Sequence, residues 1–281
     1  MADDKMQLQR WELKYVIPEE LALAVREFVR SYLELDEYGA KRADLSYTIH
    51  NLYLDSELLA IYWGTINGDK NRYKLRLRFY EDNPNAPVFF EIKRRMNDAI
   101  IKQRSGIKRP AVESILAGHL PNPSELVSGD PRQLVAIQRF IELMTRDRAC
   151  PVAHVRYDRE AWISVADNSV RVTMDRNVLI APEFVTRFTE QLDDPTCVYG
   201  RLVVLELKFT GRFPDWFKEM VRIFNLRQGS ASKFADGIAR KGEHFFHPRG
   251  ATRFMTTSAA EGAERRDARL SRLDNLMARA A

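Results

Sequence analysis

Residues 73–80 read YKLRLRFY and place Lys74, Arg76 and Arg78 on every second position of the chain. A period of two is typical of a β-strand, in which alternate side chains point to opposite faces. Tyrosine, leucine and phenylalanine fill the positions between, so one face is apolar and the other is cationic. Such a row either meets water or holds an anion. Guanidinium groups suit the second role, because they remain charged and bind phosphate oxygens in bidentate geometry.

The same alternation recurs in five further segments that lie far apart in the sequence. Their polar positions are Glu12 and Lys14; Glu91, Lys93 and Arg95; Lys102 and Arg104; Arg171, Thr173 and Asp175; and Glu206 and Lys208. The polar face of an ordinary antiparallel sheet mixes serine, threonine, glutamine, glutamate and lysine. Here arginine and lysine dominate, and like charges on neighbouring strands repel one another. We therefore favour an interior lined for an anion over a face in solvent.

The elements that position these rows are mostly strands. Alternating patterns predict strands over 10–17, 46–56, 73–81, 88–96, 99–110, 152–165, 169–178 and 201–211. Helical spacing predicts helices over 18–36, 59–70 and 214–226, and a helical insertion over about 111–148. Many antiparallel strands with helices at their ends predict an α+β fold with a single barrel-like sheet.

The chain of 281 residues is interpreted as one domain over 1–249. Residues 250–281 are rich in alanine, arginine and serine and are expected to form a polar, mobile tail. An amphipathic docking helix that uses Leu270, Leu273, Leu276 and Met277 is the alternative for this segment.

Composition excludes several classes of protein. Two cysteines make no disulfide framework, so a reduced, cytoplasmic compartment is expected. No run of about 18 apolar residues predicts a membrane span. The aromatic residues alternate away from the basic face, which argues against nucleic acid as a partner. The net charge of +5 favours an anionic partner only weakly, because 39 acidic residues offset 44 basic ones.

The ordered set of motifs resembles the VTC (vacuolar transporter chaperone) polyphosphate polymerase domain of the CYTH-like, triphosphate tunnel metalloenzyme superfamily. The matching phrases are WELKYVIP, HNLYLDS, KLRLR, EIK, YDREAW, VRVTMDRN, LELK and GSASKFADG, from about Arg10 to about Gly237. The resemblance implies an eight-stranded antiparallel β-barrel tunnel with flanking helices. It also implies that the protein is an enzyme that transfers the γ-phosphate of ATP to a growing polyphosphate chain inside this tunnel, with Mn²⁺ or Mg²⁺ as cofactor. Hydrolysis of a triphosphate, or polyphosphate binding without turnover, remain alternatives.

The resemblance also assigns roles to residues. It implies that Glu206 binds the metal, and that Glu12 and Glu91 either assist it or only screen the basic lumen. It implies that Ser232 and Lys233 close one tunnel mouth over phosphate, and Phe234 stands where the family usually has tyrosine. The implied catalytic and phosphate-contacting residues are Lys14, Arg76, Arg78, Lys93, Arg159, Arg171 and Lys233, with Lys74, Lys102, Lys208 and Ser232 binding substrate. For the arginines and lysines of the strands, an ordinary surface ion pair is the alternative, and for Ser232 and Lys233 the alternative is a loop without a role. Transport of product across a membrane would need another polypeptide as partner.

Overall fold

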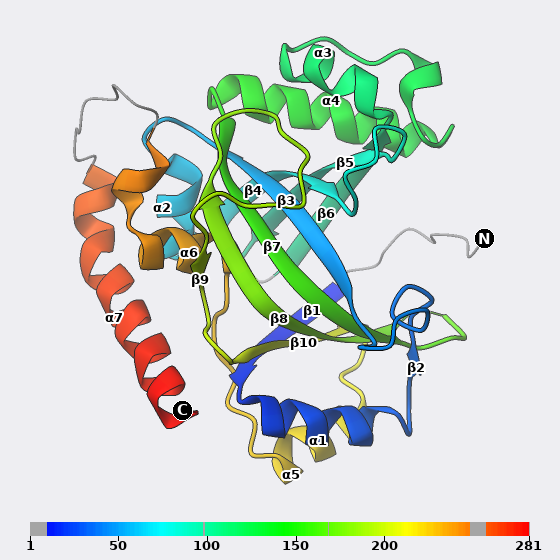
Figure 1. Ribbon diagram of the computed structural model, residues 1–281, viewed down its shortest axis with the longest axis vertical. Helices are drawn as coiled ribbons and strands as arrows, with labels where there is room; N and C mark the ends of the chain where they lie inside the picture. Colours follow the sequence, from blue (N-terminus) through cyan, green and yellow to red (C-terminus); the bar gives the residue numbers. More distant parts are fainter. Residues whose placement is uncertain (1–9, 98, 168, 248–256, 281) are drawn as a thin grey trace.

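The computed structural model describes residues 10–97, 99–167, 169–247 and 257–280. One antiparallel sheet forms the centre of the molecule (Figure 1). Its eight main strands lie in the order β1 (Arg10–Ile17), β10 (Val203–Thr210), β8 (Val170–Pro182), β7 (Cys150–Ile163), β3 (Tyr47–Asp55), β4 (Asn71–Phe79), β5 (Val88–Met96) and β6 (Ala99–Ile107). Two short strands extend it, since β2 (Glu34–Leu35) pairs with β7 and β9 (Thr196–Cys197) pairs with β8.

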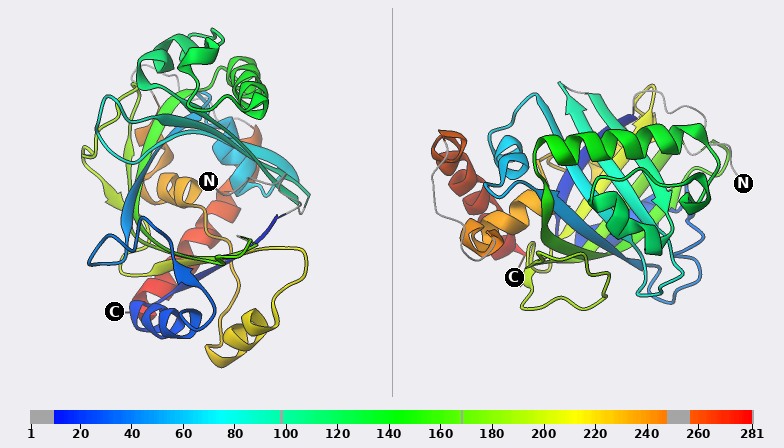
Figure 2. Two further views of the ribbon diagram at one scale, coloured as in Figure 1. Left: turned by 90° about the vertical axis from the view of Figure 1, so that its right-hand side faces the viewer. Right: turned by 90° about the horizontal axis from the view of Figure 1, so that it is seen from above.

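The sheet rolls up until its first and last strands approach each other (Figure 2). Cα atoms of β1 and β6 come within 8 Å of one another. Across this approach, the Lys93 ammonium on β5 donates to the Glu12 carboxylate on β1 at 2.8 Å. No backbone ladder joins β1 to β6 within the described residues. The eight-stranded antiparallel sheet is thus confirmed, whereas its complete closure into a barrel is not shown.

The apolar side chains of the alternating strands face outward and are covered by helices. Leu75, Leu77 and Phe90 are fully buried beside α3 (Val112–Leu116) and α4 (Pro131–Arg146). Over other strands of the same outer face, α1 (Glu19–Val29) and α5 (Asp215–Ile223) cover β1, β10 and β8. The short 3-10 helices η1 (Arg109–Ala111), η2 (Pro123–Glu125) and η3 (Glu243–Phe246) connect other elements. Because the core lies outside the rolled sheet, the polar face is left to line its interior.

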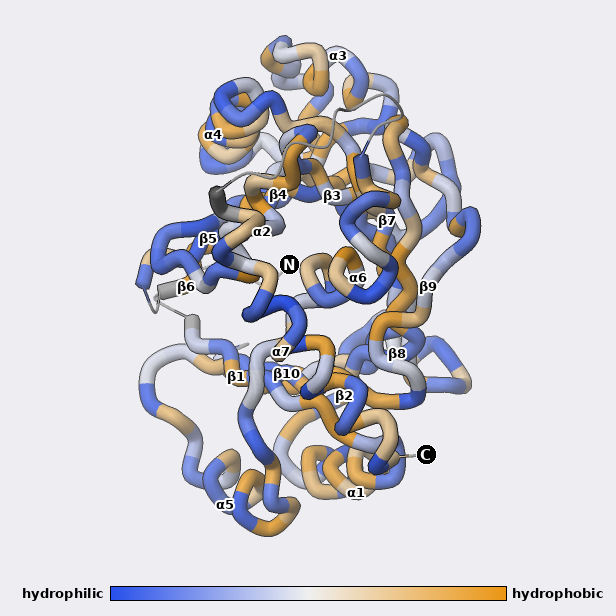
Figure 3. The backbone as a smooth tube through the Cα atoms, turned by 90° about the vertical axis from the view of Figure 1, so that its left-hand side faces the viewer, coloured by the Kyte–Doolittle hydropathy of each residue, from blue (hydrophilic) through white to orange (hydrophobic). Residues whose placement is uncertain are grey.

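A third group of helices covers one end of the rolled sheet. The helix α6 (Lys233–Lys241) lies across this end, with α2 (Ala60–Ile66) and α7 (Thr257–Arg279) packed against it (Figures 2 and 3). The sequence pattern did not predict α6. It begins at Ser232, whose hydroxyl accepts from the Ala235 amide, and it passes β8 at Gly237. A Cβ atom there would lie 2.6 Å from Ile180 Cδ1, so only glycine permits this approach.

One predicted helix was too long, and the C-terminal segment contains a helix. The helix predicted over 18–36 ends at Val29, because Glu34 and Leu35 pair with β7 instead. The tail expected to be mobile forms α7 over 257–279, in agreement with the amphipathic alternative. Leu273 on α7 is 1% exposed in the same apolar cluster as α2 and α6. Residues 250–256 and 281 lie outside the described residues.

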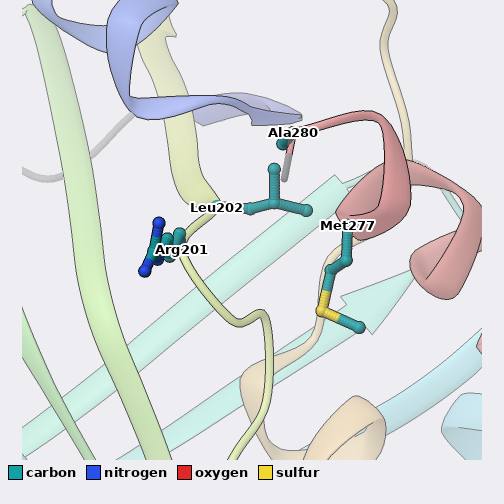
Figure 4. A pocket seen from close by; sticks show the side chains of 4 residues that line it. All are labelled: Arg201, Leu202, Met277 and Ala280. Carbon is teal, nitrogen blue, oxygen red and sulfur yellow. The ribbon is translucent and has the colours of Figure 1, made fainter.

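Helix α7 packs closely against α2 near its start, and a pocket lies beside its other end. Gly262 contacts the Trp63 ring of α2 so closely that an added Cβ would lie 2.7 Å from it. At the other end of α7, a small pocket is lined by Met277, Ala280, Leu202 and Arg201 (Figure 4). Among the described helices, none combines the length and the apolar character that crossing a membrane requires.

Replacing Leu273 by alanine tests whether α7 belongs to the folded core. We expect Leu273→Ala to lower the free energy of unfolding by about 2–5 kcal/mol, as for other buried leucines. The control is Leu23→Ala, since Leu23 on α1 is 42% exposed and should change stability by no more than about 0.5 kcal/mol. Chemical denaturation measures both. Equal effects of the two substitutions would contradict the packed position of α7.

Candidate functional site

Charged side chains from seven strands and from the start of α6 meet on the inner face of the rolled sheet. The structure brings the predicted site residues together there, and each contacts another charged or polar member of the interior. The cations are Lys14, Lys74, Arg76, Arg78, Lys93, Lys102, Arg104, Arg159, Arg171, Lys208 and Lys233. The carboxylates among them are fewer, namely Glu12, Glu91, Asp175 and Glu206.

Glu206 on β10 is the centre of the first group of charges. Its carboxylate lies 3.3 Å from Lys14 Nζ, 3.2 Å from Lys233 Nζ and 3.6 Å from Arg159 Nη2. Lys208, two residues along the strand, also contacts it. Burial by itself would raise the pKa of Glu206, but Lys208 and Lys233 outweigh burial and hold that pKa well below its usual range. Glu206 is therefore an anion surrounded by cations.

Asp175 on β8 is a site residue whose role the sequence pattern did not identify. Both of its oxygens accept from Arg159, at 2.7 Å each, and Lys233 Nζ lies 2.6 Å away. Burial raises the pKa of Asp175, yet Arg159 and Lys233 lower it further than burial raises it. The alternation in VRVTMD placed Asp175 on the charged face, and only the β7–β8 register brings it opposite Arg159.

Glu91 on β5 is the centre of a second group. It is fully buried and faces four cations: Arg76 at 2.6 Å, Lys102 at 2.8 Å, Arg104 at 3.5 Å and Arg78 at 3.8 Å. Burial would raise its pKa, but Arg78 and Lys102 hold the pKa well below the ordinary value. One carboxylate thus orients a row of guanidinium and ammonium groups along β4 and β6.

Lys74 differs from these cations because the structure gives it no carboxylate partner among the described residues. Its ammonium donates to Ser232 Oγ at 2.6 Å. Burial lowers the pKa of Lys74 well below the ordinary lysine value, and Lys14 and Lys93 lower it further. A phosphate oxygen beside Lys74 would supply the negative charge that its surroundings lack.

The loop before α6 connects this lysine to the outside of the molecule. Lys14 Nζ donates to the Ala231 carbonyl at 2.8 Å, and the Asp236 carboxylate accepts from the Ser232 amide at 2.8 Å. Asp236 is held in turn by Arg269 of α7. No periodic pattern links Asp236 to Arg269, so sequence reasoning missed both. Their contacts fix the position of Ser232 and so of the lysine that it binds.

The three glutamates predicted to bind a metal do not form one cluster. Glu12 and Glu206 share Lys14, at 3.1 Å and 3.3 Å, whereas Glu91 binds a separate set of cations. Within the described residues, no group of three histidine, cysteine or acidic side chains is arranged to hold a metal. Mg²⁺ in phosphate-handling sites commonly binds one or two carboxylates together with phosphate oxygens. Glu12 and Glu206 fit that arrangement, and Glu91 does not join it.

Known proteins resemble this chain in sequence and in fold. The model of the VTC domain family matches residues 9–241. A protein of Pyrococcus horikoshii OT3 is 13% identical over 83% of this chain and 99% of its own, with a TM-score of 0.43. A putative adenylate cyclase from Bacillus halodurans is 13% identical over 80% and 94%, with a TM-score of 0.46. A putative adenylyl cyclase from Hippeastrum, described as having a dominant triphosphatase activity, is 15% identical over 83% and 96%, with a TM-score of 0.45.

Binding of a polyanion should be coupled to proton uptake by Lys74. A bound anion raises the depressed pKa of Lys74, so the affinity for inorganic polyphosphate should fall as the pH rises through that lowered pKa. Lys74→Arg keeps its charge at these pH values and should flatten the pH dependence. Lys74→Met should weaken binding, most of all at low pH, where the wild-type lysine is charged. Titration calorimetry at several pH values measures these effects, and an unchanged slope in Lys74→Arg would remove Lys74 as the source.

Proposed function

The chain belongs to the VTC domain family, and from this premise we propose that it is a phosphotransferase that passes the γ-phosphate of ATP to a growing inorganic polyphosphate chain. The observation that carries the proposal is the excess of oriented cations on the inner face of the rolled sheet. Phosphoryl transfer mainly requires positioning and electrostatic stabilisation, so fixed cations supply much of what the reaction needs.

The arginines are held in a way that suits binding of linked phosphates. Asp175 fixes one edge of Arg159 through two hydrogen bonds of 2.7 Å, and Glu91 fixes Arg76 at 2.6 Å. A guanidinium held in this way keeps other N–H groups for a ligand, since it carries five donors. Arg159 belongs to the group of charges around Glu206, and Arg76 belongs to the group around Glu91. A chain of phosphates would bridge these two groups.

Three lysines add further positive charge near the same path. Lys233 is held between Asp175 and Glu206, and its pKa is raised because these carboxylates outweigh burial. Lys74 and Lys14 bind the loop that precedes α6. We assign Lys233 to the transferring phosphoryl group, and Lys74 with Ser232 to a neighbouring phosphate. Lys93, Lys102 and Lys208 line the remaining inner face as substrate contacts.

Glu206, with Glu12 beside it, is the donor set we propose for Mn²⁺ or Mg²⁺. Such an ion neutralises charge that develops on the transferring phosphoryl group. The carboxylates are already ionised, because the pKa of each lies far below its ordinary value. Lys14, which lies between them, must then turn from the carboxylates toward phosphate oxygens.

A product assay distinguishes a polyphosphate polymerase from a hydrolase and from a binding module without turnover. Purified protein is incubated with ATP and Mn²⁺, and the products are separated on a gel while free phosphate is measured in parallel. Long-chain polyphosphate supports the polymerase. Orthophosphate alone supports a hydrolase, because water has then replaced the phosphate chain as acceptor. Tight polyphosphate binding without either product supports a binding module.

Replacing Glu206 by glutamine separates catalysis from binding. We expect Glu206→Gln to lower turnover by about 100-fold or more and to preserve polyphosphate binding, because the change removes a negative charge from a cationic interior. The control is Glu219→Gln on the exposed face of α5, which should leave both properties unchanged. Rates with ATP and binding by calorimetry check the two effects. Full activity of Glu206→Gln would show that Glu206 does not hold the metal.

A further inference from the structure

Aromatic rings gather at the end of the rolled sheet opposite α6. They are Tyr38 in the loop after β2, Tyr47 at the start of β3, Tyr80 after β4 and Phe89 on β5, and we call them the aromatic rim. Successive ring centroids lie 5.6 Å, 6.5 Å and 6.0 Å apart. Tyr38 is 59% exposed and Tyr80 is 38% exposed, so the rim presents aromatic faces to a ligand from solvent.

The rim continues the cationic interior. Strand β4 runs from Lys74, which binds the loop before α6, to the rim beside Tyr80. At the rim itself, the Arg104 guanidinium lies 3.6 Å from the centroid of the Phe89 ring. Aromatic surface and cations thus form one path along the inner face of the sheet.

A buried carboxylate holds the rim together. Asp36 is 4% exposed, and one of its oxygens accepts from Tyr47 Oη at 3.0 Å and from Arg171 Nη2 at 3.1 Å. Its other oxygen accepts from the Gly39 amide at 2.9 Å, which anchors the loop that carries Tyr38. One side chain therefore orients two aromatic residues and one arginine. The Arg171 Nε atom is buried and has no hydrogen-bond partner among the described residues, so one donor of this guanidinium is left unsatisfied beside the rim.

We propose that the aromatic rim binds the base of a nucleoside triphosphate whose phosphates extend into the cationic interior. The proposal rests on the proposed function and adds the site that distinguishes a nucleotide from inorganic phosphate. A chain of phosphates has no apolar ring and gains nothing from exposed tyrosines, whereas every nucleobase has a flat face that stacks on them. Arg171 and Arg104 then bind the phosphates closest to the nucleoside, and Lys74 binds phosphate at the end of the interior near α6.

The test compares two ligands that differ only in the nucleoside. Affinities for ATP and for inorganic tripolyphosphate are measured by calorimetry, with Mn²⁺ present, on the full chain and on Tyr38→Ala and Tyr80→Ala. We expect each substitution to weaken ATP binding by about tenfold, which is typical of lost base stacking. Tripolyphosphate affinity should stay within about twofold, because the cations are untouched.

Conservative and remote variants serve as controls. Tyr38→Phe and Tyr80→Phe keep the ring and should retain ATP affinity. Tyr32→Ala removes an equally exposed tyrosine, one that stacks on Trp216 beside α1 and lies away from the inner face. It should change neither affinity.

The outcomes separate this inference from the proposed function. Equal losses for both ligands, or no loss for either, would overturn the rim as a base site and leave the phosphate site standing. Binding of tripolyphosphate but not ATP by the unaltered protein would overturn both the rim as a base site and ATP as the phosphate donor, and would leave only a phosphate-binding interior. If the unaltered protein binds neither ligand, both the rim proposal and the proposed function fail.

Discussion

The interior of this protein depends on the pairing of a few buried carboxylates with a larger number of cations. Glu91 and Asp175 are fully buried, and Glu206 is nearly so. A carboxylate taken out of water without partners is strongly unfavourable, and each of these has at least two cationic neighbours. The same pairing keeps the arginines and lysines in place before any ligand arrives. Because the cations outnumber the carboxylates, the interior favours a bound anion.

The rest of the fold makes such an interior possible. Rolling an antiparallel sheet with its charged face inward leaves the apolar face outside, where it needs a cover. The helices α1 and α5 supply it on one side, and α3 and α4 on another. The core therefore surrounds the site instead of filling it.

The two ends of the rolled sheet differ in chemistry, which gives the path a direction. At one end, hydrogen bonds from Lys14 and Lys74 hold the loop before α6, and Arg269 of α7 secures that loop through Asp236. The family match ends at residue 241, before α7, which supports the site from outside. At the other end, Asp36 organises the aromatic rim and Arg171. One end is built for phosphate oxygens, and the other combines cations with aromatic surface.

The period of two in segments such as YKLRLRFY determined which side chains share a face, because alternation along a strand is a local property. It therefore predicted the strands, the α+β class and the cations that converge in the structure. Sequence could not show which carboxylate meets which cation, since Asp175 reaches Arg159 only through the β7–β8 register. It also missed α6, and it left α7 as an alternative to a mobile tail, because Leu273 is buried only when distant elements assemble around it. The sequence left open whether Glu91 assists the metal or only screens the basic lumen, and its place among Arg76, Arg78 and Lys102 depends on how the strands pair. Neighbouring residues determine which side chains share a face of a strand. Contacts between side chains on different strands depend on strand register and sheet curvature, which are set only when the whole chain folds.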